Sequence, residues 1–153
     1  YEMAPPKRIH QEIVMELSVV IREHIREKGE NCKIYPAPFA VNLDREDRDW
    51  VEPDISVVCD PAKLTDRGCS GAPDLVAEIV SPSSSRMDYI IKLALYSATR
   101  VKEYWIVDPD RGRTTVYFLE RADAPVLYSF DQPIASGIFP GLVVTISDLL
   151  SGE

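Results

Sequence analysis

An acidic side chain lies inside one of the most apolar stretches of the chain. Glu78 is enclosed by five apolar residues, in a run that ends at Ser81: Leu75, Val76, Ala77, Ile79 and Val80. A short apolar run of this kind is typical of a strand that is buried on both faces. An ionised carboxylate at such a depth costs several kcal/mol, roughly the effective penalty for an unpaired buried ion. A metal ion, a basic side chain or a proton must therefore neutralise Glu78.

A second acid stands where another strand is expected to begin. Asp54 opens the β-prone segment 51–60, and Pro53 before it favours an extended backbone at Glu52. If this strand lies beside that of Glu78, the two carboxylates can converge on one divalent cation. Mg²⁺ suits such a pair because it takes one or two carboxylates and retains several waters. A metal bound there would polarise a phosphoryl oxygen and lower the pKa of a bound water.

A helix is expected directly after the strand of Glu78. Ser85 and Asp88, three residues apart, form a capping-box-like start. Lys92 and Tyr96 continue from Asp88 at four-residue spacing, so the three form one row on the helix surface. A lysine in this row can stabilise negative charge developing on phosphorus, but the row alone is also typical of a solvated flank. The buried stripe of this helix is expected to consist of its apolar residues: Met87, Ile90, Ile91, Ala94, Leu95 and Ala98.

The remaining elements define the scaffold. Apolar residues from Ile9 to Ile25 recur at helical spacing and stop at Gly29, which predicts a first helix of about five turns. His10 lies at the edge of its apolar stripe, either as an ordinary boundary residue or at the rim of a site. Further strands are predicted at 33–43, 103–108, 113–119, 126–130 and 141–146. The order predicts an α+β fold, in which helices flank one mixed central β-sheet.

Composition limits the possible functions. The 153 residues are expected to form a single domain, 1–153. A net charge of −8 makes non-specific DNA binding unfavourable, because phosphates are neutralised by Lys and Arg. Any nucleic-acid function must therefore depend on a local basic patch or on a bound metal.

Cysteine content and hydropathy bear on the compartment. The three cysteines lack metal-ligand spacing and are expected to be reduced thiols. The longest apolar runs are too short to span a membrane, and no secretory signal precedes the first helix. We therefore expect a cytoplasmic protein without membrane contact.

Several motifs, taken in order, resemble those of one protein family. They are Pro53-Asp54-Ile55, the run from Ala72 to Ser83, the row of Asp88, Lys92 and Tyr96, and the run from Glu103 to Pro109. Together they resemble the Uma2 family of restriction endonucleases, a branch of the PD-(D/E)XK nuclease superfamily. The similarity extends from Pro36 to Leu142. It implies a restriction-endonuclease-like core with an αβββαβ arrangement.

The resemblance also implies roles for individual residues. Asp54 and Glu78 match the two metal-binding acids, and the backbone carbonyl of Ile79 matches a further ligand. The lysine that the superfamily places two residues after the acid is replaced by Val80 in this chain. Lys92 matches the position of the family's lysine on the following helix.

His10 and Tyr96 are candidates for an outer shell of the same site. The implied activity is that of an endonuclease that uses Mg²⁺ or Mn²⁺ to hydrolyse DNA, and a homodimer is the expected assembly. A second function class stays open, in which the domain is catalytically silent and acts as a binding or regulatory module. A third interpretation makes Glu78 and Lys92 a buried ion pair without a metal.

Overall fold

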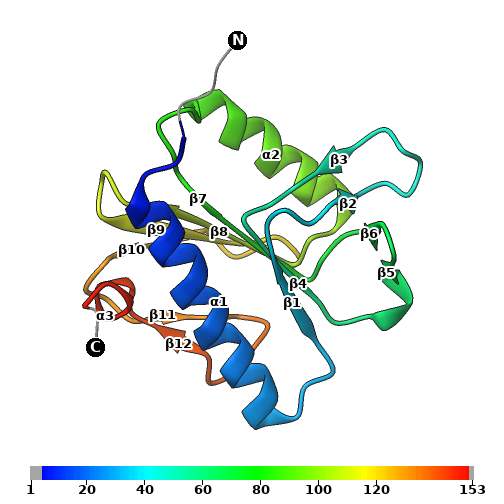
Figure 1. Cartoon of the computed structure of the whole chain (residues 1–153). Coiled ribbons are helices and arrows are strands. Elements are labelled where there is room, and N and C mark those ends of the chain that lie inside the picture. Colours follow the sequence, from blue (N-terminus) through cyan, green and yellow to red (C-terminus); the bar gives the residue numbers. More distant parts are fainter. Residues whose placement is uncertain (1–4, 152–153) are drawn as a thin grey trace.

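The computed structural model describes residues 5–151, so residues 1–4 and 152–153, the ends of the expected domain, lie outside the described residues. A six-stranded sheet forms its centre, in the order β1-β4-β7-β8-β9-β10 (Figure 1). Its strands are β1 (Lys33–Pro36), β4 (Ile55–Val58), β7 (Leu75–Ile79), β8 (Glu103–Asp108), β9 (Arg113–Phe118) and β10 (Val126–Ser129). β7 and β8 are parallel, and every other neighbouring pair in this sheet is antiparallel. The predicted mixed sheet is confirmed.

Smaller elements surround this sheet. A four-stranded sheet contains β2 (Val41–Asn42), β3 (Trp50–Val51), β5 (Leu64–Thr65) and β6 (Gly68–Ser70), and the 3-10 helix η1 (Pro61–Lys63) precedes β5. β11 (Ile134–Ala135) pairs with β12 (Val143–Val144), and α3 (Ile146–Leu149) follows. The strand expected at 33–43 is therefore two short strands, β1 and β2, which belong to different sheets.

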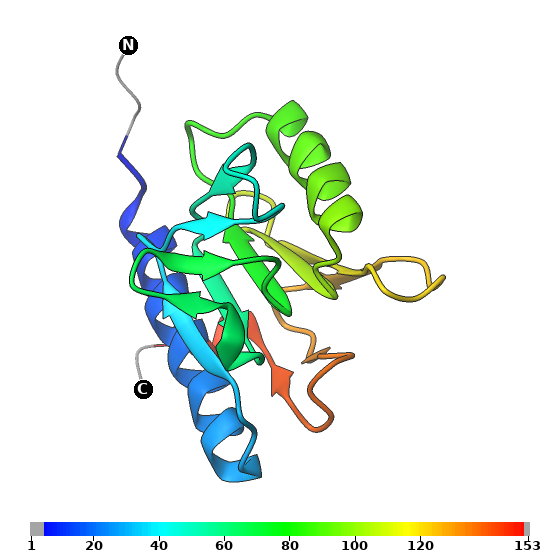
Figure 2. The ribbon, with the colours of Figure 1, turned by 90° about the vertical axis from the view of Figure 1, so that its right-hand side faces the viewer.

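Two helices cover the two faces of the central sheet (Figure 2). α1 (Arg8–Lys28) packs its buried residues against one face, and the largest apolar cluster lies between them. Its apolar stripe is the predicted one: Ile13, Leu17, Ile21 and Ile25. Gly29 ends the helix in the left-handed conformation, with a φ of 64°. α2 (Arg86–Thr99) lies over the other face, where a second cluster contains Val76, Tyr96 and Tyr104.

The start of α2 follows the prediction, but its orientation does not. The Ser85 side chain accepts from the Asp88 N–H, and Asp88 accepts from the Ser85 N–H, which completes the predicted capping box. The predicted buried stripe is wrong. Met87, Ile90 and Ile91 are 60%, 52% and 58% exposed.

The helix instead turns its more polar side toward the sheet. Lys92 and Tyr96 point inward and contact Glu78, and Tyr96 is fully buried. Glu78 requires donors from this direction because it lies on a buried strand. The hydrogen bonds to the Glu78 carboxylate therefore decide the orientation of α2, and its most apolar face stays exposed.

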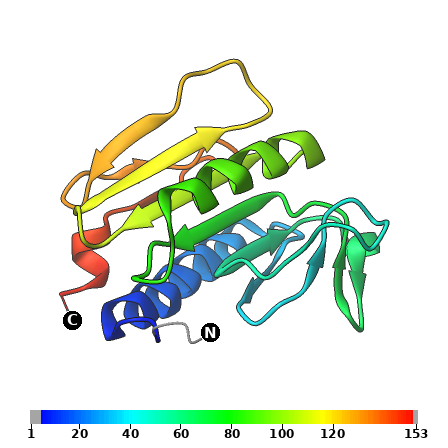
Figure 3. The ribbon, with the colours of Figure 1, turned by 90° about the horizontal axis from the view of Figure 1, so that it is seen from above.

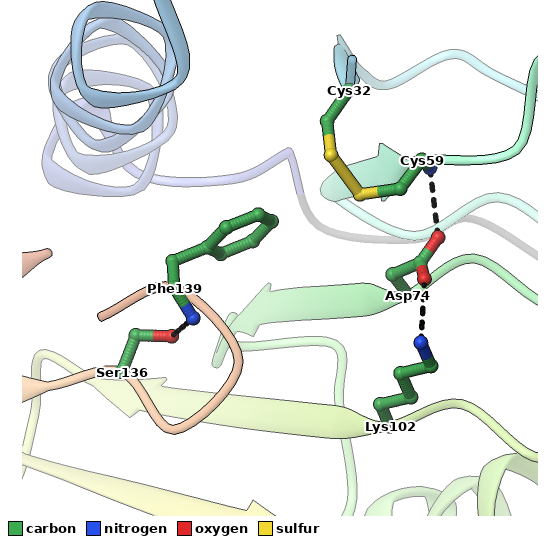
Figure 4. Close-up of a disulfide and its surroundings, with 6 residues drawn as sticks. All are labelled: Cys32, Cys59, Asp74, Lys102, Ser136 and Phe139. Atoms are coloured by element: carbon green, nitrogen blue, oxygen red, sulfur yellow. Dashed lines mark hydrogen bonds and ion pairs between the residues drawn. A yellow bond between two sulfur atoms is a disulfide. The ribbon is translucent and has the colours of Figure 1, made fainter. Parts of the chain in front are cut away.

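The expectation of three reduced cysteines is also wrong. Cys32 and Cys59 form a disulfide (Figure 4). Cys69 is free and buried. The antiparallel register of β1 and β4 pairs Lys33 with Val58, so the residues just beyond this pair face each other. The backbone N–H of Cys59 also donates to Asp74 at 2.8 Å. In the part of the chain that the structure describes, no helix has the length and apolar character to cross a membrane.

Candidate active site

Asp54 and Glu78 lie at the same end of two neighbouring strands. Asp54 directly precedes β4, and the register of β4 with β7 pairs Ile55 with Ala77. Continuing this register by one residue places Asp54 opposite Glu78, at the end of the two strands. The Asp54 carboxylate there meets His10 of α1, whereas the Glu78 carboxylate meets Lys92 of α2, which covers the other face of the sheet. The Ile79 N–H donates to Asp54 Oδ2 at 2.8 Å, which holds the Asp54 carboxylate against the end of β7.

Three donors surround the Glu78 carboxylate, whose side chain is 4% exposed. Lys92 Nζ lies 2.9 Å from Oε1, and the Tyr96 hydroxyl donates to the same oxygen at 3.2 Å. The Tyr104 hydroxyl donates to Oε2 at 2.6 Å. Burial, followed by the negative charge of Glu78, raises the pKa of both phenols. Both hydroxyls therefore stay protonated and can donate to the Glu78 carboxylate.

His10 contributes to the site from α1. Its Nε2 lies 3.2 Å from Asp54 Oδ2, and Asp54 is more open to solvent than Glu78, with a side chain that is 24% exposed. His10 Nδ1 is buried and has no hydrogen-bond partner among residues 5–151. The sequence was compatible with His10 as a boundary residue or as a residue at the rim of a site. In the structure, His10 contacts Asp54, one of the two candidate acids.

The similarity to known proteins agrees with this arrangement. A model of the Uma2 family, described as "Putative restriction endonuclease", matches residues 1–147. The chain belongs to the Uma2 family. This confirms the family resemblance that its motifs indicated.

A solved structure and a curated protein are also similar to this Uma2 chain. The crystal structure of a protein from Anabaena variabilis, described as a putative nuclease, superposes with a TM-score of 0.77 and 21% identity, covering 99% of this chain and 85% of that one. It confirms a nuclease-like fold. An uncharacterized protein of Synechocystis sp., slr1290, is 29% identical over 118 residues, or 76% of this chain. The matched part spans 60% of that relative's length.

Tyr104 is a site residue that the sequence motifs do not mark. Tyr104 lies on β8, fully buried, and its ring packs edge-to-face on Tyr96 with centroids 4.8 Å apart. The available signal was a phenol in a strand that is otherwise largely apolar, because a buried tyrosine hydroxyl usually has a hydrogen-bond partner. That partner lies on β7, and chain order alone did not identify it.

Sequence analysis also gave no role to a second buried glutamate. Glu103 on β8 is fully buried and accepts four hydrogen bonds. The donors are the Trp105 indole at 2.8 Å, the Ser136 hydroxyl at 2.9 Å, and the Gly137 and Ile138 N–H groups at 2.7 and 3.2 Å. These partners tie β8 to the loop before β12. Glu103 is therefore a structural carboxylate.

A divalent-cation site at Asp54 and Glu78 stays a prediction. Within residues 5–151, no group of three His, Cys, Asp or Glu side chains is arranged to hold a metal. The predicted ligands, which are the two carboxylates and the backbone carbonyl of Ile79, are oxygen donors of the kind that Mg²⁺ takes when it keeps several waters. Zinc would call for a fuller set of nitrogen and sulfur ligands. Lys92 cannot be a ligand, because its ammonium has no lone pair.

Proposed function

We propose that this protein is an endonuclease that uses Mg²⁺ or Mn²⁺ to hydrolyse DNA phosphodiester bonds, with Asp54 and Glu78 as metal ligands. The observation that carries the proposal is the orientation of α2. The helix brings Lys92 and Tyr96 to Glu78 and leaves Ile90 and other large apolar residues exposed. Proteins break such local packing rules mainly at functional sites.

Each residue has a distinct role in this proposal. A bound cation would polarise a phosphoryl oxygen and lower the pKa of a water. Tyr96 and Tyr104 fix the orientation of the Glu78 carboxylate by donating to its two oxygens. His10 and the Ile79 N–H orient Asp54.

Lys92 is the residue proposed to act on the substrate. Its side chain is 39% exposed, so the ammonium can reach an incoming phosphate while staying next to Glu78. A positive charge there offsets the negative charge that develops on the scissile phosphate.

The assembly and compartment are further proposals. The family resemblance implies a homodimer, which sedimentation equilibrium tests directly. Composition favours the cytoplasm, whereas the disulfide between Cys32 and Cys59 is more usual in oxidising compartments. The redox state of these two cysteines in freshly lysed cells is therefore the sharper test of location.

The second candidate function is a catalytically silent binding or regulatory module. It is favoured by the ion pair of Glu78 with Lys92, which already supplies a counter-charge at 2.9 Å, and by the net charge of −8. Under this alternative, calorimetric titration of Mg²⁺ or Mn²⁺ gives no binding heat. Under the endonuclease proposal, the wild type binds one of these ions and nicks plasmid DNA in its presence.

Replacement of Lys92 separates catalysis from metal binding. We expect Lys92→Ala to leave metal affinity almost unchanged and to slow plasmid nicking in Mn²⁺ by about 10²–10³-fold, the scale for loss of one electrostatic stabiliser. Lys92→Arg should restore activity only partly, because a planar guanidinium does not replace a compact ammonium. Calorimetry and the nicking assay are run on each variant.

Lys102→Ala is the matched control. Lys102 also pairs with a carboxylate, that of Asp74 at 3.3 Å, and its side chain is 48% exposed. Asp74 also accepts from the Cys59 N–H (Figure 4) and precedes the first residue of β7, whereas Glu78 lies near the last, so the loss of Lys102 should leave nicking unchanged. Wild-type nicking by Lys92→Ala would contradict the proposed role of Lys92.

A further inference from the structure

A cleft lies beside the candidate site, on the same face of the sheet. Its volume is about 590 Å³, and it is bounded by the first two turns of α2 and by β8 and β9. α2 lies along this face of the sheet (Figure 3). Three arginines line it: Arg86 on α2, Arg111 in the turn between β8 and β9, and Arg113 on β9. We call it the arginine cleft.

The charges of the arginine cleft are only partly compensated. Asp108 lies 3.9 Å from Arg111, and Asp110 lies 3.5 Å from Lys7. Among residues 5–151, no acidic side chain lies within ion-pair distance of Arg86 or Arg113. Asp108 and Asp110 also line the cleft, so its lining is slightly positive, with three arginines against two aspartates, in a chain with a net charge of −8.

Aromatic side chains connect the arginine cleft to the candidate site. Tyr117 lines the cleft and stacks on Tyr104, the donor to Glu78, with ring centroids 6.2 Å apart. Tyr89 also lines the cleft, and Lys92 Nζ lies 5.8 Å from its ring centroid. Burial raises the pKa of Tyr89 to about 12, and the nearby charge of Glu78 acts in the same direction. A ligand in the cleft would therefore lie next to Glu78 and Lys92.

The composition of the cleft indicates what it binds. Arginines at the rim match phosphate oxygens, to which a guanidinium can donate two parallel hydrogen bonds. Tyrosine rings and apolar side chains such as Leu93 and Ile106 offer surfaces to unstacked bases. This combination is typical of grooves that bind single strands. A volume of about 590 Å³ is that of a small-ligand pocket, so it suits a few atoms of backbone and an unpaired base.

We propose that the arginine cleft binds an unpaired stretch of the DNA strand next to the phosphodiester at the Asp54 and Glu78 site. The substrate is then single-stranded DNA or DNA with a locally unpaired region. The identity of the cleaved bond rests on the proposed function, but strand binding by the cleft does not require cleavage.

The test measures binding without metal. Fluorescence anisotropy at low salt, in EDTA, compares a fluorescein-labelled 12-nucleotide DNA strand with the same strand annealed to its complement. We expect the wild type to bind the single strand at least about 10-fold more tightly. Arg113→Ala and Arg86→Ala should each weaken binding several-fold and reduce the slope of log K against log salt by about 0.7, the value for one lost contact to single-stranded nucleic acid.

Arg26→Ala provides the control. Arg26 is an exposed arginine in the last turn of α1, outside the arginine cleft, so its loss removes the same charge without touching the proposed site. It should leave both affinity and salt slope close to those of the wild type. A matching circular dichroism melt for each variant checks that the fold is intact.

The outcomes distinguish this inference from the proposed function. Equal or tighter binding of the duplex, no binding of the strand, or equal loss in Arg26→Ala and Arg113→Ala would overturn the arginine cleft as the strand site. If the strand binds as expected but neither Mg²⁺ nor Mn²⁺ supports cleavage, the cleft stands and the nuclease proposal fails. If the wild type cleaves duplex plasmid but the cleft variants bind the strand as tightly as the wild type, the nuclease proposal stands and the arginine cleft fails as the strand site.

Discussion

Glu78→Gln is expected to abolish metal binding and DNA cleavage while the protein stays folded. Glutamine keeps the volume of glutamate and removes its charge, which relieves repulsion from Asp54. The hydroxyls of Tyr96 and Tyr104 can rotate to accept hydrogen bonds from the new amide, and the partly exposed Lys92 can turn to solvent. Stability should therefore change by only about 1 kcal/mol.

Calorimetry with Mg²⁺, a plasmid nicking assay and a urea melt give the three readouts for Glu78→Gln. Retained metal binding would remove Glu78 from the ligand set. Loss of about 3–5 kcal/mol of stability would instead identify Glu78 as half of a structural ion pair with Lys92.

Glu103→Gln should have the opposite effect, with little change in chemistry and a large loss of stability. All four groups around the Glu103 carboxylate are donors, and two of its four hydrogen bonds come from backbone N–H groups that cannot turn away. The Ser136 hydroxyl is further constrained because it accepts from the Phe139 N–H (Figure 4). A glutamine amide would direct its own N–H groups at donors. We expect a loss of about 2–4 kcal/mol, since an unsatisfied buried group costs about 1–3 kcal/mol and more next to a lost charge.

Urea unfolding measures this loss: the midpoint of Glu103→Gln should be lower than that of the wild type. The slope of the unfolding free energy against urea concentration should be unchanged. At temperatures where this variant is folded, its affinity for Mg²⁺ should equal that of the wild type. The two glutamine variants are matched controls for each other, because they make the same change on neighbouring strands. If Glu78→Gln unfolds and Glu103→Gln stays stable, Glu78 rather than Glu103 is the structural carboxylate.

The features that sequence predicted well are local. The span of α1 follows from apolar spacing and Gly29. The strands β8 and β9 and the capping box of Ser85 and Asp88 likewise depend on residues that are close in sequence. Family motifs singled out Asp54, Glu78 and Lys92, whose metal-binding and catalytic roles stay predictions. The structure nevertheless brings the three to one end of β4 and β7.

The features that sequence missed depend on distant residues. The orientation of α2 is decided by the buried carboxylate of Glu78. Because Glu78 lies outside the helix, the apolar periodicity of α2 cannot predict it. The same holds for Tyr104, whose partner lies on another strand. Cys32 and Cys59 are separated by 27 positions, and only the register of β1 with β4 brings them together.

The disulfide fixes one end of a strand at the edge of the central sheet. β1 is at the edge of the sheet and pairs with β4 alone, and at its far end the Ala37 N–H donates to the Asp54 carbonyl at 2.9 Å. Reduction of the Cys32–Cys59 bond should therefore make β1 a separate unit of local opening. In amide hydrogen exchange, adding a reductant should speed exchange in β1 by about 10-fold or more while β7 and β8 keep their protection. Asp54, a candidate metal ligand, is bonded through its backbone to the end of β1. Reduction of the Cys32–Cys59 disulfide should therefore release Asp54 from its place more often.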